Sequence, residues 1–179
     1  MKIKYLAYVA LVTELALCAT ASTAQPAFNT GNGTDNPDWV EEAPPPPPAL
    51  ATDHLIPIAM PPYVSIKVGV DPDSIVVGGD GVVRYVIVMT NATGNTNAAY
   101  EGLRCATDEV KTYARLSASG SWSLQVSPVW KSVGDNMPSH HAQAFARQGG
   151  CQNKLATSKR EIVDALKAGL RPTLSKRAY

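Results

Sequence analysis

The residues able to do chemistry gather in the second half of the chain: Glu101, Cys105, His140, His141 and Cys151. A carboxylate and an imidazole can exchange protons with a substrate, so Glu101 with His140 or His141 is the pair that a hydrolase would use. Cys105 with either histidine as its base would instead be a nucleophile. The sequence contains no HExxH, Gly-x-Ser-x-Gly or P-loop motif, so no motif ties these groups to a particular reaction.

The adjacent histidines are poorly placed for a metal ion. Neighbouring residues on a helix point about 100° apart, so His140 and His141 would rarely share one ion. We expect both to lie on a helix surface or to be partly packed, and we predict no metal site and no cofactor. His54, the remaining histidine, stands isolated at the end of a proline-rich segment.

The N-terminus bears on whether the cysteines are reactive. Met1 to Lys4 is basic, Tyr5 to Leu17 is mostly apolar and a run of small residues follows, which together predict a signal peptide over residues 1–24. The mature protein would then lie in the periplasm or cell envelope, where thiols tend to oxidise. Cys105 and Cys151 are therefore predicted to form a disulfide rather than to supply a catalytic thiol.

The third cysteine, Cys18, opens an alternative to the free periplasmic form. Leu15 to Cys18 loosely resembles a bacterial lipobox, whose acylated cysteine would make the protein an outer-membrane lipoprotein. Leu17 stands where that motif favours a small residue. Cleavage after Ala21 or Ala24 is therefore the favoured interpretation, and Cys18 would leave with the signal.

Glu101 belongs to a possible polar cluster that comprises Arg84, Glu101, Arg104 and Lys111. Strand alternation places Glu101 and Cys105 on one face and Arg104 on the other. If Cys105 reaches a helix, Glu101 is drawn inward and needs a cation, which Arg84 or Lys111 could supply. We expect a structural ion pair. A polar ligand pocket with a perturbed glutamate is the alternative.

Short β-strands must position these side chains. Apolar and polar residues alternate, and turn-forming residues recur along the chain, a pattern typical of an antiparallel sheet. Asp71 to Ser74 is expected to turn the chain, and Gly78 to Gly81 to close a hairpin. We expect the sheet to be curled or partly closed, which would protect its edges. The six predicted strands span residues 64–70, 75–77, 82–90, 98–106, 110–116 and 122–126.

Helical periodicity replaces the strand pattern after Pro138. Ser139 can cap a helix over residues 140–148, and Ser158 with Glu161 has the spacing of a capping box for a second helix that stops at Gly169. The predicted fold is therefore α+β: a curved antiparallel β-sheet of about six strands with one or two C-terminal helices, stapled by the disulfide. We assign residues 54–168 to this single domain and residues 169–179 to a flexible tail.

Residues 25–53 are predicted to form a disordered, proline-rich linker. Pro44 to Pro48 favour a polyproline II helix, which suits either a semi-rigid spacer or a proline ligand for an aromatic groove. Trp39, Trp122 and Trp130 could together form a platform that stacks on sugar rings. A core position is the favoured interpretation for Trp122, and cover for the sheet edge for Trp130.

The charge of the chain limits its partners. There are 16 lysines and arginines against 15 aspartates and glutamates, a net charge of +1. Nucleic-acid binding normally needs a basic surface, so we predict no nucleic-acid partner. The apolar run near the N-terminus is short and is interrupted by Glu14, so we predict no transmembrane span in the mature chain.

Several motifs resemble the CNP-one-like family of proteobacterial envelope proteins. They include Trp39 to Glu42, the DGVVRY element at Asp80 to Tyr85, the YEGLRC element at Tyr100 to Cys105, and Trp130 with Lys131. The resemblance runs from about residue 39 to 151. It implies export, often as a lipoprotein, and it supplies no catalytic residue.

These observations favour an exported cell-envelope protein. We expect a non-enzymatic binding or structural module whose partner is a protein, glycan or lipid component of the envelope. The alternative is a periplasmic hydrolase that uses Glu101 with His140 or His141.

Overall fold

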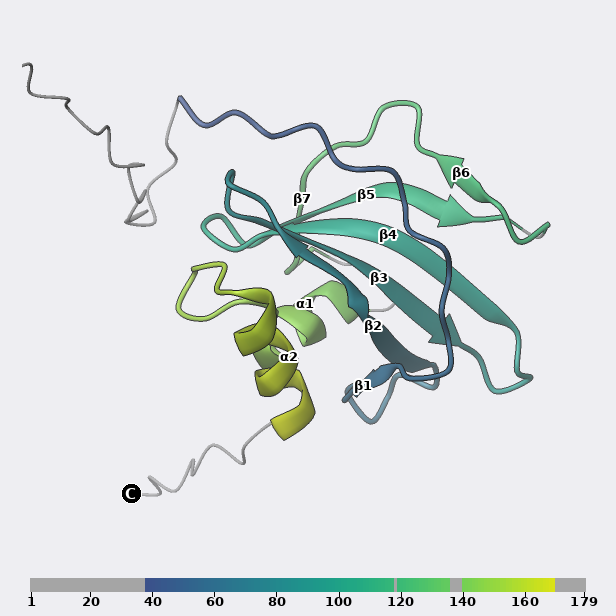
Figure 1. Ribbon diagram of the computed structural model, residues 1–179. Helices are drawn as coiled ribbons and strands as arrows, with labels where there is room; N and C mark the ends of the chain where they lie inside the picture. Colours follow the sequence, from purple (N-terminus) through teal and green to yellow (C-terminus); the bar gives the residue numbers. More distant parts are fainter. Residues whose placement is uncertain (1–37, 118, 136–139, 170–179) are drawn as a thin grey trace, which may run out of the picture. The chain divides into compact units, whose positions relative to one another are not determined.

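The computed structural model of the chain describes residues 38–117, 119–135 and 140–169. They form one antiparallel sheet and two short C-terminal helices, which confirms the predicted α+β class (Figure 1). The predicted signal peptide over residues 1–24, Cys18 and the predicted tail beyond Gly169 lie outside the described residues. The strands are β1 (Ile56–Ile58), β2 (Lys67–Val77), β3 (Val82–Thr90), β4 (Thr96–Arg104), β5 (Glu109–Leu116), β6 (Trp122–Leu124) and β7 (Lys131–Ser132).

Four long strands, β2 to β5, form a meander at the centre of the sheet. The β3 and β4 partners include Val83 with Leu103 and Tyr85 with Glu101, so these four side chains share one face. The predicted hairpin is confirmed: the Gly78 N–H donates to the Val82 carbonyl at 3.0 Å. Gly81 closes this turn with a φ of 76°, a conformation that favours glycine.

The predicted turn at Asp71 to Ser74 is wrong. Strand β2 runs through it, and the register with β3 shifts between Asp71 and Val76, which marks a β-bulge. Pro72 has no N–H to donate to the β-ladder, and it lies in the bulge, where the regular ladder is interrupted. Ser74 Oγ donates to the Asp71 carbonyl at 2.6 Å and accepts the Val86 N–H at 2.8 Å. The two predicted strands are therefore one.

The sheet is open rather than closed, with strand order β1-β2-β3-β4-β5-β6. Strands β6 and β7 both pair with β5, at Ala114–Leu116 and at Glu109–Val110 respectively. The short strands β1 and β7 were not predicted, and β6 ends at Leu124, earlier than expected. Sequence alternation does not reveal strands of two or three residues.

The two helices cover one face of the sheet (Figure 1). They are α1 (His141–Phe145), which continues into a wider turn over Ala146–Gly150, and α2 (Lys159–Ala168). The ring of Phe145 lies 4.1 Å from that of Tyr85, and Ile162 and Leu166 complete the buried core. The predicted capping box at Ser158 and Glu161 is present at the start of α2. None of the helices among the described residues is long and apolar enough to cross a bilayer.

The predicted disulfide is confirmed. Cys105 follows β4, Cys151 follows the turn after α1, and their sulfur atoms are bonded, with the Cα atoms 5.6 Å apart. The bond joins positions that are 46 residues apart in the sequence. It therefore ties the helical layer covalently to the end of a central strand.

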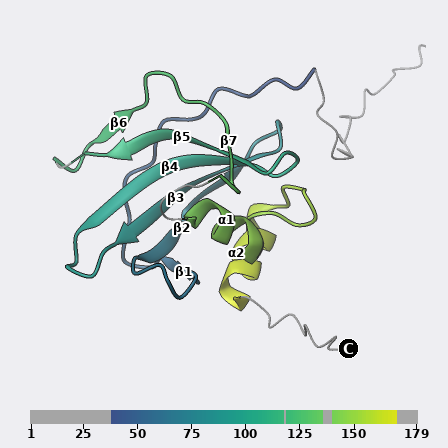
Figure 2. The ribbon, with the colours of Figure 1, turned by 180° about the vertical axis from the view of Figure 1, so that it is seen from behind.

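The opposite face of the sheet is covered by an N-terminal segment, residues 38–55, which we call the strap. In Figure 1 the strap (dark blue) crosses in front of the sheet, and in Figure 2 it passes behind it. Leu50 and Leu55 pack against a second apolar cluster that includes Tyr100, Tyr113 and Val86. The sheet thus has a separate cover on each face.

The strap corrects the expectation of a linker over residues 25–53. Residues 38–53 lie on the domain, whereas residues 25–37 lie outside the described part of the chain. A proline-rich segment is already extended, so it loses little entropy on docking, and its carbonyls remain free to accept hydrogen bonds. The Trp122 indole N–H donates to the Pro48 carbonyl at 2.7 Å.

Candidate functional site

The most deeply buried carboxylate with several side-chain partners is Glu101, which lies on the face of the sheet that the helices cover. Strand β4 supplies it, and α1 begins at His141, whose Nε2 lies 2.9 Å from Glu101 Oε2. The Tyr85 hydroxyl donates to Oε2 at 3.1 Å, and the Thr112 hydroxyl donates to Oε1 at 3.2 Å. The side chains of Glu101 and His141 are only 1% and 7% exposed. The carboxylate is thus enclosed by donors.

Glu101 and His141 hold each other in the charged state. Burial opposes ionisation of Glu101, but the facing imidazole and the hydrogen bonds outweigh it and lower the pKa of the carboxyl group. Burial also disfavours the imidazolium, yet the charge of Glu101 outweighs this and raises the pKa of His141. Burial and the nearby Glu101 charge raise the pKa of the Tyr85 hydroxyl, which stays a donor. The result is a buried ion pair.

The partner of Glu101 differs from the predicted ones. The expectation of a buried glutamate that needs a cation agrees with the structure, but the cation is His141 rather than Arg84 or Lys111. Gly102, the neighbour of Glu101 in β4, pairs with Arg84 of β3 on one side and with Lys111 of β5 on the other. The side chains of Arg84 and Lys111 therefore lie on the face of the sheet opposite to Glu101. The candidate cluster of Arg84, Glu101, Arg104 and Lys111 is therefore divided by the sheet.

His141, not His140, is the histidine that meets Glu101. The φ of His140 is 49°, just before α1, and its side chain is half-buried. The proposed catalytic pair of Glu101 and His141 is thus brought together. Both carboxylate oxygens already accept hydrogen bonds, so the arrangement suits a structural pair better than a general base.

Arg84 anchors the first part of the strap. Its guanidinium donates to Asp80 Oδ2 at 2.7 Å and Oδ1 at 3.2 Å, and to the Glu42 carbonyl at 2.8 Å. Burial opposes both charges, but the two-point hydrogen bonding outweighs it: it lowers the pKa of Asp80 and raises that of Arg84. Glu42 also accepts the Gly79 N–H at 3.2 Å. This pair fixes the strap to the β2–β3 hairpin.

Lys111 anchors the strap through Glu41. Its ammonium lies 2.6 Å from Glu41 Oε2, and the Tyr113 hydroxyl donates to Oε1 at 2.8 Å. The Trp130 indole N–H donates to the same carboxylate at 3.2 Å. Burial and the Glu41 charge raise the pKa of Tyr113, which keeps its proton. Gly102 lies directly beneath the Tyr113 ring, where a Cβ would collide with it.

Arg104 anchors the strap through Trp39. Its guanidinium lies 3.8 Å from the centroid of the Trp39 ring, a cation–π contact, and its Nη1 is 3.4 Å from Glu109 Oε2. Trp39 also donates from its indole N–H to the Asp80 carbonyl at 2.8 Å and meets Trp130 edge to face. Trp39, Trp122 and Trp130 therefore take part in the contacts between the strap and the sheet, and they do not form an open platform for sugar rings.

Trp39, Glu41 and Glu42 of the strap are the partners of the three cations, and they were not predicted from the sequence. Two adjacent carboxylates beside a tryptophan, in a segment otherwise poor in charge, were the available signal. They match three cations that strand alternation could have assigned to one face of the sheet.

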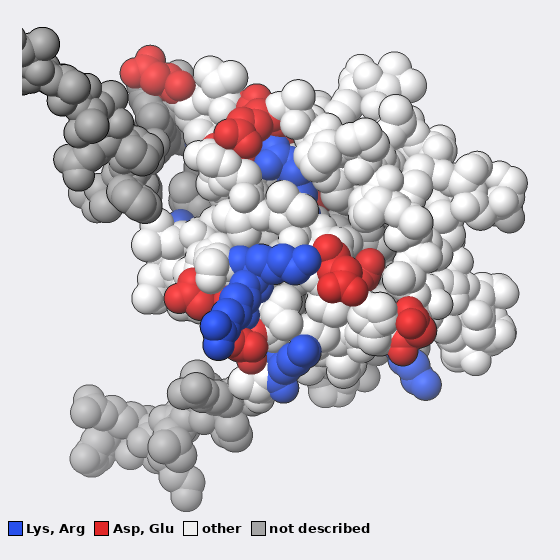
Figure 3. Space-filling view, viewed as in Figure 1, with Lys and Arg blue, Asp and Glu red and all other residues white. Residues whose placement is uncertain are grey.

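A different kind of surface lies at the β6 edge of the sheet, over residues 122–129, which we call the edge segment. The side chains of Leu124, Val126 and Val129 are apolar and are 67%, 100% and 60% exposed. The sequence from Leu116 to Trp130 has no charged residue. Figure 3 shows the end of the molecule where β6 lies as an uncharged surface, in contrast to the charged surface over α2.

Comparison with other proteins gives one match. A family model described as the CNP1-like family matches residues 34–167, which contain the strap, the whole sheet, α1 and all of α2 except Ala168. No curated protein and no solved structure matches the chain.

Proposed function

The chain belongs to the CNP1-like family, and we propose that it is an exported cell-envelope protein that acts by binding rather than by catalysis. Its contact surface is the edge segment, and its partner is an extended segment of another envelope protein. The observation that carries this proposal is the exposure of Leu124, Val126 and Val129 on an uncharged sheet edge.

The Cys105–Cys151 disulfide supports export. A stable structural disulfide needs an oxidising compartment, such as the periplasm, and the N-terminal 24 residues have the order of a signal peptide. The free periplasmic protein is our proposal, and a lipoprotein acylated at Cys18 is the alternative. Mass spectrometry of the mature N-terminus distinguishes them, since only the lipoprotein retains a diacylated Cys18.

The buried ion pair supports binding over catalysis. Glu101 accepts hydrogen bonds from Tyr85, Thr112 and His141, so a substrate proton would have to displace one of them. Both side chains are buried between α1, which supplies His141, and the sheet, which supplies Glu101. A hydrolase would instead present its base to a cleft that admits the substrate.

The edge segment has the features of a surface that pairs with another strand. Among the residues that the structure describes, β6 pairs with β5 on one side and with no strand on the other, which leaves an edge able to pair with a further strand. Proteins usually protect such edges with charged residues, and β6 has none. A partner strand that added to β6 would satisfy the backbone and cover the apolar side chains.

Site-specific photocrosslinking in the native envelope tests this proposal. A photoreactive residue at Val126 is expected to give one discrete protein adduct, whereas the same residue at the exposed Val76 of β2 should give none. Leu124→Asp should abolish the Val126 adduct without a change in melting temperature. No adduct at Val126, or the same adduct from both positions, would contradict the assignment of the edge segment.

A further inference from the structure

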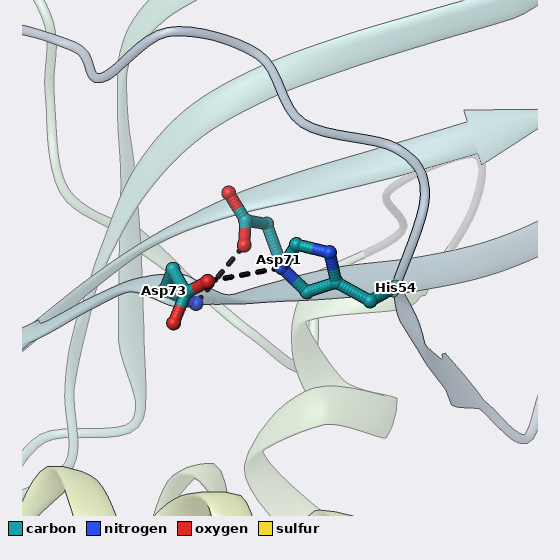
Figure 4. Close-up of side chains that lie close together, drawn as sticks. All are labelled: His54, Asp71 and Asp73. Carbon is teal, nitrogen blue, oxygen red and sulfur yellow. Dashed lines mark hydrogen bonds and ion pairs between the residues drawn. The ribbon is translucent and has the colours of Figure 1, made fainter.

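The end of the strap meets the bulge of β2 in a cluster of three metal-ligating side chains. His54 comes from the strap, and Asp71 and Asp73 come from either side of Pro72. One donor atom of each lies within 4.8 Å of the other two. Figure 4 shows the imidazole and the two carboxylates turned toward one another.

The orientation of His54 is that of a metal ligand with its second hydrogen bond in place. Its Nδ1 lies 2.9 Å from Asp53 Oδ1, and its Nε2 lies 2.9 Å from Asp73 Oδ2. Metal-binding histidines usually donate one ring N–H to a carboxylate, which fixes the ring and leaves the other nitrogen for the ion. Asp53 fills that role, and Nε2 faces the cluster.

Asp71 supplies an independent observation. The residue is only 3% exposed, and its carboxylate accepts one hydrogen bond from the described residues, the Asp73 N–H at 2.9 Å. Within those residues no lysine, arginine or histidine forms an ion pair with it. Lys159, the nearby cation, donates to the Asp73 carbonyl instead. Its second oxygen accepts no hydrogen bond from those residues and is not closed off from solvent, so it is available as a ligand for a cation.

We propose that His54 Nε2, Asp71 and Asp73 bind a transition-metal dication of the Zn²⁺ class, with water in the remaining position. One imidazole nitrogen and two carboxylate oxygens, at about 2.0 to 2.2 Å each, form a three-ligand zinc site. The imidazole favours Zn²⁺ over Mg²⁺ or Ca²⁺, which prefer oxygen ligands. Tetrahedral ligands lie about 3.4 Å apart at these bond lengths, so the cluster needs only small movements.

The surroundings give an ion access from solvent. His54 and Asp73 line a shallow surface cavity of about 520 Å³ between the β2 bulge and α2. Because His54 belongs to the strap and the aspartates belong to β2, a bound ion would join the two. No metal site was predicted from the sequence, in which His54 stands isolated and the adjacent histidines are poorly placed to share an ion.

Calorimetric titration of the untagged, oxidised mature protein tests the site. We expect one Zn²⁺ per chain and no measurable binding of Mg²⁺ or Ca²⁺ at the same concentration. His54→Gln and Asp73→Asn change exposed residues, so the fold should survive, and each should weaken binding at least tenfold. Asp53→Asn should weaken it by about 10- to 100-fold, as expected for loss of an orienting partner.

Two results would overturn the proposal. One is the absence of stoichiometric Zn²⁺ binding to the wild-type protein. The other is unchanged binding in the double variant His54→Gln, Asp73→Asn, which would place the ion elsewhere. Asp164→Asn serves as the matched control, because this residue lines the same cavity but lies outside the cluster, and its binding should equal that of the wild type.

Discussion

The two faces of the sheet are covered in different ways. The helical face buries large apolar side chains, such as Phe145, Ile162 and Leu166, and adds a disulfide and a buried ion pair. The strap face has a smaller apolar cluster, and the strap itself is held by polar anchors at Trp39 and Glu41. Apolar burial scales with area, whereas partly exposed ion pairs contribute little each.

The difference indicates two levels of stability. Separation of the helices from the sheet requires global unfolding, because core burial and a covalent bond oppose it. Release of the strap breaks a few side-chain contacts and leaves the sheet intact. Local opening of this kind needs less free energy than global unfolding. Variants on the helical face should therefore lower the global stability, whereas variants on the strap face should mainly promote local opening of the strap.

The largest expected effect comes from loss of the disulfide. The double variant Cys105→Ala, Cys151→Ala should lower the free energy of unfolding by about 4 kcal/mol, because the bond closes a long loop. Urea unfolding monitored by circular dichroism measures this, with chemically reduced wild-type protein as the control. Equal midpoints for the variant and the oxidised wild type would show that the bond does not stabilise the helical face.

The buried ion pair should have the next largest effect. His141→Ala leaves Glu101 charged and buried without its cation, and we expect a loss of about 3 kcal/mol. The double variant Glu101→Gln, His141→Gln should lose less unfolding free energy than the two single variants together. Each single variant leaves the other residue buried without its partner. Retained stability with loss of partner binding or hydrolysis in Glu101→Gln would instead identify a functional site.

A smaller and local effect is expected at the strap. Trp39→Ala removes the cation–π contact with Arg104 and the indole hydrogen bond to Asp80. The free energy needed to release the strap from the sheet should fall by about 2 kcal/mol. Protease cleavage within residues 40–53 should accelerate, while the global unfolding midpoint changes little. Val40→Ala is the matched control, since Val40 is next to Trp39 in the sequence and its own side chain is exposed. A large global loss would contradict the separation of the two faces.

The smallest expected effect is a dependence on pH. The pKa of Glu101 is lowered from 4.5, so its contribution is present above pH 4.5 and is lost as pH falls through the lowered value. The pKa of His141 is raised from 6.5, so its contribution is present below pH 6.5 and is lost as pH rises through the raised value. The pair should therefore stabilise most between these two pH values.

The difference in unfolding free energy between the wild type and the Glu101→Gln, His141→Gln variant measures this dependence. Other titrating groups are common to both proteins, so their contributions cancel. We expect the difference to shrink on either side of the window from pH 4.5 to 6.5. A difference that did not vary with pH would contradict a charged pair.

The helical face was largely predictable because its signals are local. The hairpin glycines, the capping box at Ser158 and the alternation that put Glu101 and Cys105 on one face all act within a few residues. The choice of His141 as partner required knowledge of how α1 docks on the sheet. Sequence alternation could assign Arg84 and Lys111 to a face of the sheet, but not to a particular partner.

The strap was not predictable in the same way. Proline content suggested a linker, because few apolar residues were available to hold it. Its contacts to Asp80, Lys111 and Trp122 join positions far apart in the sequence, and no periodic pattern signals them. For the same reason His54 looked isolated, although it lies beside Asp73 in the fold.

The strap, residues 38–55, is part of the folded domain, and this is the central claim. Nuclear Overhauser contacts in the oxidised protein test it most directly. The account predicts contacts from the Trp39 ring to the Arg104 side chain and to the Trp130 ring. The Arg104 guanidinium lies 3.8 Å from the centroid of the Trp39 ring. Random-coil shifts across residues 38–53, without those contacts, would contradict it.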